Sequence, residues 1–195
     1  MKTIETTLTT TAIYADDCTR KYLIRKVWEE SKPSLAIVLL APSTTGGVAL
    51  DNTTQRTICN ADRLGFGSVS IVNLFSTMEK LNSGSAVAED GENMKIILAE
   101  AKKCDVLVYA PGNGKAKNQA FQARAAQVLK QLKPYEKKMK CLSNEDGTVR
   151  LRHPLFPAVR TWYLRETTIA EAMQTISEEQ PSKSTKSTGK PKKAQ

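Results

Sequence analysis

Histidine is nearly absent from this chain of 195 residues, which contains one, and the four cysteines are far apart. Cys18, Cys59, Cys104 and Cys141 form no C-x-x-C pair, and no short cluster of His and Cys exists. Zinc and iron–sulfur sites use such spacings, so we expect neither a metal site nor any other cofactor. Reduced and mostly buried thiols are the interpretation that we prefer.

Long apolar runs are missing too. The longest covers residues 35–41 and ends at Pro42, well short of the roughly 18 residues that a membrane span needs. The Thr-rich N-terminus lacks the apolar stretch of a signal peptide. A content of 40% apolar and 25% charged residues is ordinary for a globular protein. We therefore expect one domain over residues 1–179 that is cytoplasmic, monomeric and not bound to membranes.

Acidic residues are scarce where the basic ones gather. The segment 180–195 carries five lysines and no acid, and its Ser/Lys/Pro/Gly composition predicts a disordered tail. Residues 102–140 hold a second basic concentration, with Asp105 and Glu136 as the only acids. Basic charge of this kind attracts polyanions such as DNA without selecting a base sequence. The alternative is a solvated helix face with a solubilising tail.

Strands and helices alternate through the middle of the chain. Residues 35–41 are continuously apolar between Pro33 and Pro42, which is typical of a strand buried on both faces of a parallel sheet. Residues 51–64 predict a helix, with Asp51 or Asn52 as N-cap and Gly65 after its end. Similar patterns predict strands at 68–74, 105–110 and 138–142, and helices around 94–101, 117–134 and 168–177. A capping box of Thr168 and Glu171 is expected to open the last helix.

This alternation predicts an α/β fold, a doubly wound and mainly parallel four-stranded central sheet with helices on both faces. Extra N-terminal strands are expected at 7–15 and 20–27. Ligands of such sheets bind outside the carboxyl ends of the strands. The residues just past those ends are 41–47, 73–77, 111–115 and 143 onward, and we add 153–157 because of the histidine there.

Three of these loops carry residues suited to chemistry. Residues 41–47 offer hydroxyl groups and two glycines that let a ligand approach the backbone. Asn73 at a strand mouth can donate and accept together, as the edge of a nucleic-acid base requires. His153, held by Pro154 and preceded by Arg152, suits the stabilisation of negative charge. The alternatives are an ordinary loop, a turn-forming Asn and a surface His.

Taken together, these residues resemble the bacterial and phage family known as domain of unknown function 1643. The family pattern is roughly N-P-S-T-A, D-P-T-x-x-R, N-L-F, W-G-x-x-G and R-H-P-L. The chain has corresponding residues in the same order: Ala41-Pro42-Ser43-Thr44-Thr45, Asp51-Asn52-Thr53-Thr54-Gln55-Arg56, Asn73-Leu74-Phe75, Pro111-Gly112-Asn113-Gly114 and Arg152-His153-Pro154-Leu155.

That family is in turn similar to the uracil-DNA glycosylase superfamily, and the resemblance implies roles for the matched residues. Asn73 would read an extruded base, and His153 would stabilise charge on the departing base. Ser43, Thr44 and the loop backbone would hold phosphate or position water. The remaining matched positions would contact substrate or DNA: Ala41, Pro42, Arg56, Phe75, Gly112, Asn113, Arg152 and Leu155.

Two positions depart from the pattern. Ala41 stands where related loops carry an Asp or Asn that orients water, although some glycosylases of the superfamily have Ala there. Asp51 is the candidate for the missing carboxylate. Pro111 replaces the tryptophan of the family and is expected to reshape the pocket.

The function that these features favour is a monofunctional DNA glycosylase, an N-glycosidic hydrolase. It would flip out and excise a uracil-like or bulky hypermodified phage base and leave an abasic site, with anti-phage defence as the role in the second case. One alternative is a hydrolase of free nucleotides or modified nucleosides. Another is a non-catalytic DNA-binding protein with a degenerate glycosylase pocket.

Overall fold

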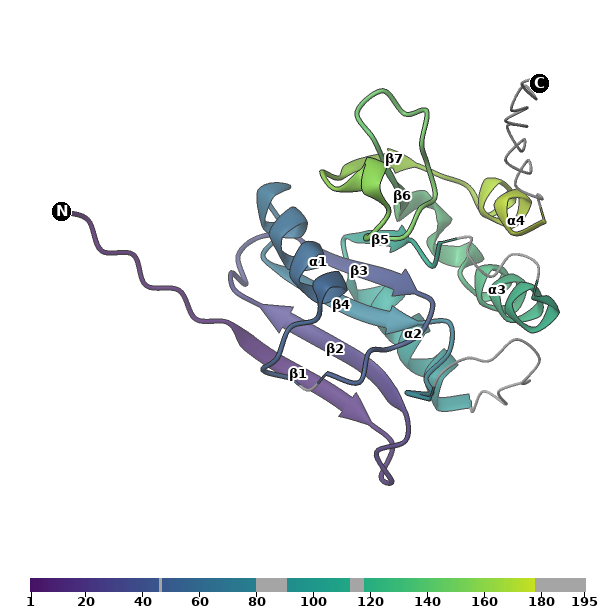
Figure 1. Cartoon of the computed structure of the whole chain (residues 1–195), viewed down its shortest axis with the longest axis horizontal. Coiled ribbons are helices and arrows are strands. Elements are labelled where there is room, and N and C mark those ends of the chain that lie inside the picture. The colour runs from purple at the N-terminus through teal and green to yellow at the C-terminus, as the bar shows by residue number, and fades with distance from the viewer. Residues whose placement is uncertain (46, 80–90, 113–117, 178–195) are drawn as a thin grey trace, which may run out of the picture.

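A single seven-stranded sheet runs through the protein, in the strand order β1-β2-β4-β3-β5-β6-β7 (Figure 1). The computed structural model describes residues 1–45, 47–79, 91–112 and 118–177. Gly46, Asn113 and the tail 180–195 therefore lie outside the described residues. The strands are β1 Thr9–Tyr14, β2 Lys21–Val27, β3 Ser34–Leu39, β4 Ser68–Asn73, β5 Val106–Tyr109, β6 Met139–Ser143 and β7 Tyr163–Glu166.

The sheet is mixed, and it is larger than the sequence predicts. β3 pairs in parallel with both β4 and β5, and β5 pairs in parallel with β6. Antiparallel pairing joins β1 to β2, β2 to β4 and β6 to β7. The expected α/β fold is thus confirmed, but the sheet is larger than the four strands expected for its centre, because the N-terminal strands extend the same sheet and β7 was not expected.

Helices cover both faces of this sheet. In Figure 1, α1 (Asn52–Arg63) lies in front of the strands and α2 (Gly91–Lys103) behind them. One buried cluster joins the sheet to α2, α3 (Gln119–Gln131) and α4 (Ile169–Ser177), and the other joins it to α1. Alternate residues of β3 enter the two clusters, which explains why its sequence is apolar throughout.

The predicted helix ends are confirmed. The Asp51 side chain caps α1 by accepting from the backbone N–H groups of Thr53 and Thr54, and Gly65 follows the helix with φ of 85°. Thr168 and Glu171 form the expected capping box, each side chain accepting from the other's backbone N–H (3.1 and 3.2 Å). Within the described residues, no helix has both the length and the apolar character needed to span a bilayer.

Asn60 ties α1 to the segment that leads into β7. Its side chain donates to the carbonyl oxygen of Arg160 (3.1 Å) and accepts from the backbone N–H of Trp162 (2.9 Å). Both Asn60 and Trp162 are buried. A short 3-10 helix, Pro157–Val159, precedes this contact. The chain between β6 and β7 is thereby fastened at its far end to the helix that covers the front of the sheet.

We expect Asn60→Ala to lower the free energy of unfolding by about 2 kcal/mol, because the backbone groups of Arg160 and Trp162 lose their buried partner. Urea unfolding followed by circular dichroism measures this. Cys59→Ala, at the exposed neighbouring position of α1, is the control and should change stability by less than about 0.5 kcal/mol. Equal effects of the two substitutions would contradict the bridging role.

Candidate functional site

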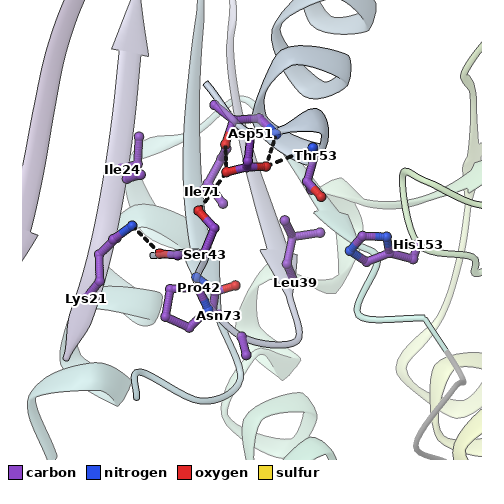
Figure 2. Close-up of a pocket in the computed structure, with 12 residues that line it drawn as sticks. Lys21, Ile24, Leu39, Pro42, Ser43, Asp51, Thr53, Ile71, Asn73 and His153 are labelled. Carbon is purple, nitrogen blue, oxygen red and sulfur yellow. Dashed lines mark hydrogen bonds between the residues drawn. The ribbon is translucent and has the colours of Figure 1, made fainter. Parts of the chain in front are cut away.

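A cavity of about 140 Å³ lies at the carboxyl ends of β3 and β4, on the face of the sheet that α1 covers (Figure 2). Its floor is formed by side chains of β2, β3 and β4, and the loop from β3 to α1 forms one wall. In Figure 1 this loop crosses in front of β2 toward β1 before it returns to α1. The lining residues are Lys21, Ile24, Leu39, Ala41, Pro42, Ser43, Asp51, Thr53, Thr54, Ile71, Asn73 and His153.

The cavity brings together six of the residues selected from the sequence, namely Ala41, Pro42, Ser43, Asp51, Asn73 and His153. Gly112 adjoins them, because a Cβ added there would lie 3.0 Å from the Cβ of His153. Asn113 lies outside the described residues. Four other selected residues do not line the cavity: Thr44, Arg56, Arg152 and Leu155.

Phe75 is not a pocket residue in this structure. Its side chain is 5% exposed and belongs to the core cluster under α2 and α3. The motif position is therefore occupied by a residue that packs the fold, on the face of the sheet opposite the cavity.

Asp51 organises the wall of the cavity. One carboxylate oxygen accepts from the backbone N–H groups of Thr53 (2.8 Å) and Thr54 (2.9 Å). The other accepts from the hydroxyl groups of Ser43 (2.6 Å), Thr45 (3.1 Å) and Thr54 (3.0 Å). Burial raises the pKa of Asp51, but these hydrogen bonds lower it by more, so it lies below its ordinary value of 3.8. The carboxylate is ionised, and its lone pairs are occupied.

Two buried lysines of β2 hold the same loop from the side of the sheet. Lys21 Nζ donates to the carbonyl oxygens of Ser43 (2.5 Å) and Thr45 (2.7 Å). Lys26 Nζ donates to the carbonyl oxygen of Gly47 and to the Thr10 hydroxyl. Each lysine is 2% exposed, and burial lowers the pKa of both. The loop is therefore fixed by hydrogen bonds at both of its sides.

Asn73 presents an unsatisfied amide to the cavity. Its side chain is 4% exposed, and Oδ1 has no hydrogen-bond partner among the described residues. The backbone at this point is held from behind, because Asn93 of α2 donates to the carbonyl oxygens of Asn73 and Leu74. Arg124 of α3 also donates to the Leu74 carbonyl (2.7 Å). A buried amide oxygen without a partner costs free energy that a ligand donor would recover.

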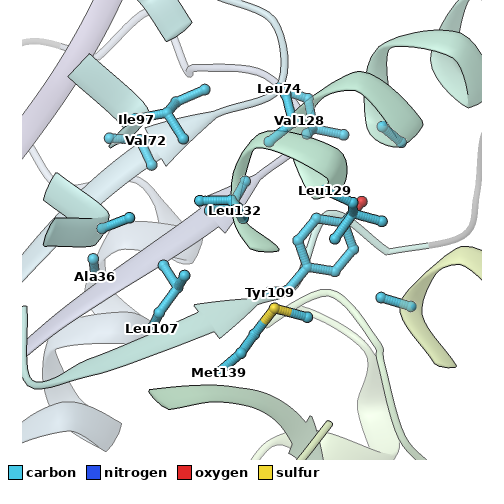
Figure 3. Packing of buried hydrophobic residues seen from close by; sticks show 14 of the residues in the cluster. Ala36, Val72, Leu74, Ile97, Leu107, Tyr109, Val128, Leu129, Leu132 and Met139 are labelled. Atoms are coloured by element: carbon cyan, nitrogen blue, oxygen red, sulfur yellow. The ribbon is translucent and has the colours of Figure 1, made fainter. Parts of the chain in front are cut away.

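Leu74 anchors the strand end in the core. It is fully buried, and Figure 3 shows it packed beside Val128 of α3. Because neighbouring residues of a strand point to opposite faces, burying Leu74 under α3 directs Asn73 to the cavity side.

His153 faces the cavity as a neutral imidazole. Its Nδ1 accepts from the backbone N–H of Leu155 (3.2 Å), so the neutral ring carries its proton on Nε2. Burial lowers the pKa of His153 below 6.5, and Asp51 opposes that shift. Figure 2 shows the ring on the cavity side of its backbone. A half-buried Nε2–H donor on a wall of the cavity can stabilise an oxygen or nitrogen that gains negative charge.

The turn before His153 is held in an unfavourable backbone conformation. Leu151 has φ of 55°, a left-handed geometry that costs a non-glycine residue roughly 1 kcal/mol. Its side chain packs against the cluster under α2 and α3, and its N–H donates to the carbonyl oxygen of Leu142 (3.1 Å). These contacts hold the turn in place, and with it the start of the His153 loop.

Four described lysines of residues 102–140 lie at the opposite end of the parallel strands from the cavity. Lys102 and Lys103 end α2 just before β5 begins, and Lys137 and Lys138 end a 3-10 helix just before β6 begins. These four lysines therefore lie at the amino ends of β5 and β6. The cavity lies at the carboxyl ends of β3 and β4, and β3 and β5 run parallel. These four lysines do not line the cavity, and Lys115, Lys117 and the lysines of the tail lie outside the described residues.

Sequence reasoning missed Lys21 and the apolar floor, which is made of Ile24, Leu39 and Ile71. The available signal for Lys21 was a lysine directly before the short apolar run Tyr22-Leu23-Ile24 of β2. The described residues contain no group of three or more His, Cys, Asp or Glu side chains that could hold a metal ion.

Comparison with known proteins adds one finding. The model of a protein family described as "Protein of unknown function (DUF1643)" matches residues 21–155. The match includes β2, the loop from β3 to α1, Asn73 and the histidine turn, and thus nearly every part of the cavity. No match was found among curated proteins. Because the matched region covers well over half of the chain, the protein belongs to the DUF1643 family.

Proposed function

We propose that the protein is a DNA glycosylase that takes a flipped pyrimidine-type base into the cavity and cleaves its N-glycosidic bond. The observation that carries the proposal is that two groups line the same cavity: the buried amide oxygen of Asn73, which has no partner among the described residues, and the neutral imidazole of His153. An amide that both donates and accepts suits the edge of a base. A preorganised N–H donor suits the charge of a leaving base.

The size of the cavity supports a base with one ring. A protein cavity of about 150 Å³ accommodates benzene, and this one measures about 140 Å³. A six-membered ring fits that volume, whereas a purine has a second ring. A hypermodified pyrimidine would have to direct its substituent out of the cavity, toward solvent. The proposal includes excision of such a base from phage DNA, and hence a role in defence, provided that the substituent points out of the cavity.

The proposed reaction is dissociative. Asn73 binds the flipped base, and the bond between the base and the sugar breaks as electrons move onto the base. The Nε2–H of His153 donates a hydrogen bond to the base as its negative charge grows. Water then adds to the sugar cation, and the proton that this water loses neutralises the departing base anion. His153 suits this role because its lowered pKa keeps the ring neutral at pH 7.

Asp51 is assigned a positioning role in this reaction. Its two carboxylate oxygens accept five hydrogen bonds from the loop and from the first turn of α1. No lone pair remains to take a proton from water. The carboxylate that was considered as a substitute for the residue at Ala41 therefore keeps Ser43 and the loop in place.

Contacts with the DNA backbone are proposed for the turn that carries His153. The Arg152 guanidinium lies over the Phe156 ring, 5.0 Å from its centroid. Its Nε and Nη1 are buried and have no partner among the described residues, so its proposed contribution is the attraction of its positive charge for phosphate. Leu155 is 43% and Phe156 38% exposed, as expected of side chains that insert beside a flipped nucleotide.

A second candidate is a protein that binds a flipped base without cleaving it. The observation that favours it is the saturation of Asp51, since no other carboxylate among the described residues lines the cavity. The two candidates differ in one result, the release of the base.

The first experiment incubates the protein with duplex and single-stranded oligonucleotides and detects abasic sites by alkaline cleavage. The substrates contain uracil, thymine opposite guanine, a hypermodified pyrimidine, or hypoxanthine as a two-ring base. We expect release of a pyrimidine base and no release of hypoxanthine. Asn73→Ala and His153→Ala should each lower the single-turnover rate about 10²-fold.

Gln55→Ala, an exposed amide of α1 that does not line the cavity, is the matched control and should keep the wild-type rate. Binding of pyrimidine-containing DNA with no base release favours the second candidate. Activity that survives loss of both Asn73 and His153 would refute the proposed site.

The protonation of His153 can be measured without any substrate, since it is the only histidine in the chain. Imidazole NMR should show the Nε2–H tautomer and a pKa below 6.5, because burial disfavours the charged ring. Asp51→Asn should lower this pKa further by removing a nearby negative charge. As pH falls through 6.5, protonation of the unfolded state should cost stability. A pKa above 6.5 would count against the neutral donor.

The role of Asp51 is tested by separating stability from rate. Asp51→Ala should lower the free energy of unfolding by about 1 kcal/mol or more, because α1 loses its cap. Asp51→Asn keeps a capping oxygen and should reduce kcat less than about tenfold. Loss of a true general base would reduce kcat by about 10²–10⁴-fold, and that result would overturn the positioning role.

A further inference from the structure

Lys21 places a buried amino group on the cavity wall without a carboxylate partner. The residue is 2% exposed and lines the cavity. It forms no ion pair with any described residue, and its hydrogen bonds go to the carbonyl oxygens of Ser43 and Thr45. A lysine ammonium has three N–H donors, so one donor is left without an acceptor in the part of the chain that the structure describes. The Tyr14 ring contacts the same group, 5.6 Å from Nζ.

Asp51 is the other charged group on the cavity wall, but no ion pair joins it to Lys21. Asp51 is close enough to raise the pKa of Lys21, but its oxygens accept hydrogen bonds from the loop and from α1. His153 is neutral, and Asn73 is an amide. The buried ammonium therefore has a carboxylate nearby but none in contact, and a buried cation gains stability from an anion in direct contact.

Lys21 and His153 are separated across the cavity. Figure 2 draws them on opposite sides, with Pro42 and Asn73 between them. A ring bound against Asn73 would thus have the imidazole on one side and the ammonium on the other. The two groups can act on different atoms of one ligand.

Lys26 shows that a buried lysine can hold this loop without its amino group lining the cavity. It is as buried as Lys21, and it also donates to a loop carbonyl oxygen, that of Gly47. It also donates to the hydroxyl of Thr10 (2.7 Å), and it does not line the cavity. Holding the loop explains both lysines equally well, but it does not explain why one of them faces the ligand space.

We propose that Lys21 makes the cavity selective for a pyrimidine ring that carries a negatively charged substituent, such as a carboxylate, on the side away from His153. This proposal rests on the assignment of the cavity as a base-binding pocket, but it does not depend on bond cleavage. The ammonium and the substituent form a buried ion pair inside the cavity, away from water. A cationic substituent at the same place is repelled.

The experiment measures binding of free bases to the full-length protein by isothermal titration calorimetry at pH 7.5. The probes are uracil, 5-carboxyuracil, 6-carboxyuracil and 5-aminomethyluracil. At least one carboxylated base should bind about tenfold or more tightly than uracil, as one charge-assisted contact provides. The aminomethyl base should bind more weakly than uracil. The two carboxylated probes report which ring position faces Lys21.

Lys21→Gln keeps two N–H donors for the loop carbonyls and removes the charge. It should abolish the preference for the carboxylated base while leaving uracil affinity within about threefold, whereas Lys26→Gln should keep the preference. If Lys21→Gln does not fold, the affinities of the wild-type protein for the four bases alone decide the test.

Uracil binding without a preference for either carboxylated base overturns the role of Lys21 and leaves the base pocket intact. A preference that survives Lys21→Gln overturns it as well. Failure of all four bases to bind overturns both this inference and the pocket assignment. Base release from DNA is measured separately, so cleavage activity cannot conceal any of these outcomes.

Discussion

The five hydrogen bonds that Asp51 accepts are the constraint on which the cavity depends. They connect the start of α1 to the hydroxyl groups of Ser43 and Thr45, and so they fix a loop that would otherwise only cross the face of the sheet. Lys21 and Lys26 fasten the same loop to β2 from the other side. The space between loop and sheet persists because these polar contacts, and not apolar packing, hold the wall. Few apolar side chains close it, which leaves a cavity instead of more core.

This construction limits the chemistry that the cavity can support. A carboxylate that is fully used as a helix cap is held ionised and cannot exchange protons near neutral pH. The remaining groups that face the space are an amide, a neutral imidazole and a buried lysine. Each of these donates hydrogen bonds, and none is a strong base at an accessible position. The wall is therefore suited to an electron-rich or negatively charged ligand, and much less suited to activating a nucleophile.

The sequence predicted those parts of the structure whose cause is local. The cap at Asp51, the Thr168–Glu171 capping box and the buried β3 strand follow from residue types at fixed spacings, and the carboxyl ends of parallel strands brought Ser43 and Asn73 together.

Tertiary packing decided the rest of the structure. Lys21 would normally be interpreted as a surface residue, and only the loop that covers it buries it. Phe75 lies beyond the end of β4 at Asn73, where strand alternation no longer sets the direction of a side chain, and it packs in the core cluster under α2 and α3. β7 is a short edge strand with a half-exposed pattern. Lys102, Lys103, Lys137 and Lys138 lie where their helices end, away from the cavity.

The alanine at position 41 has a physical explanation for the proposed glycosylase. In a dissociative cleavage the bond to the base breaks first, and the barrier depends mainly on how well the departing base is stabilised. The sugar cation that results is reactive enough to be captured by water that no carboxylate has activated. In the proposed reaction, His153 on one side of the cavity and Lys21 on the other would both stabilise the base. Asp51 already places one carboxylate in this cavity, and a second carboxylate at position 41 would further weaken the attraction of Lys21 for a negatively charged ligand. Under the proposed charge selectivity, Ala41 and Lys21 are therefore consistent with each other.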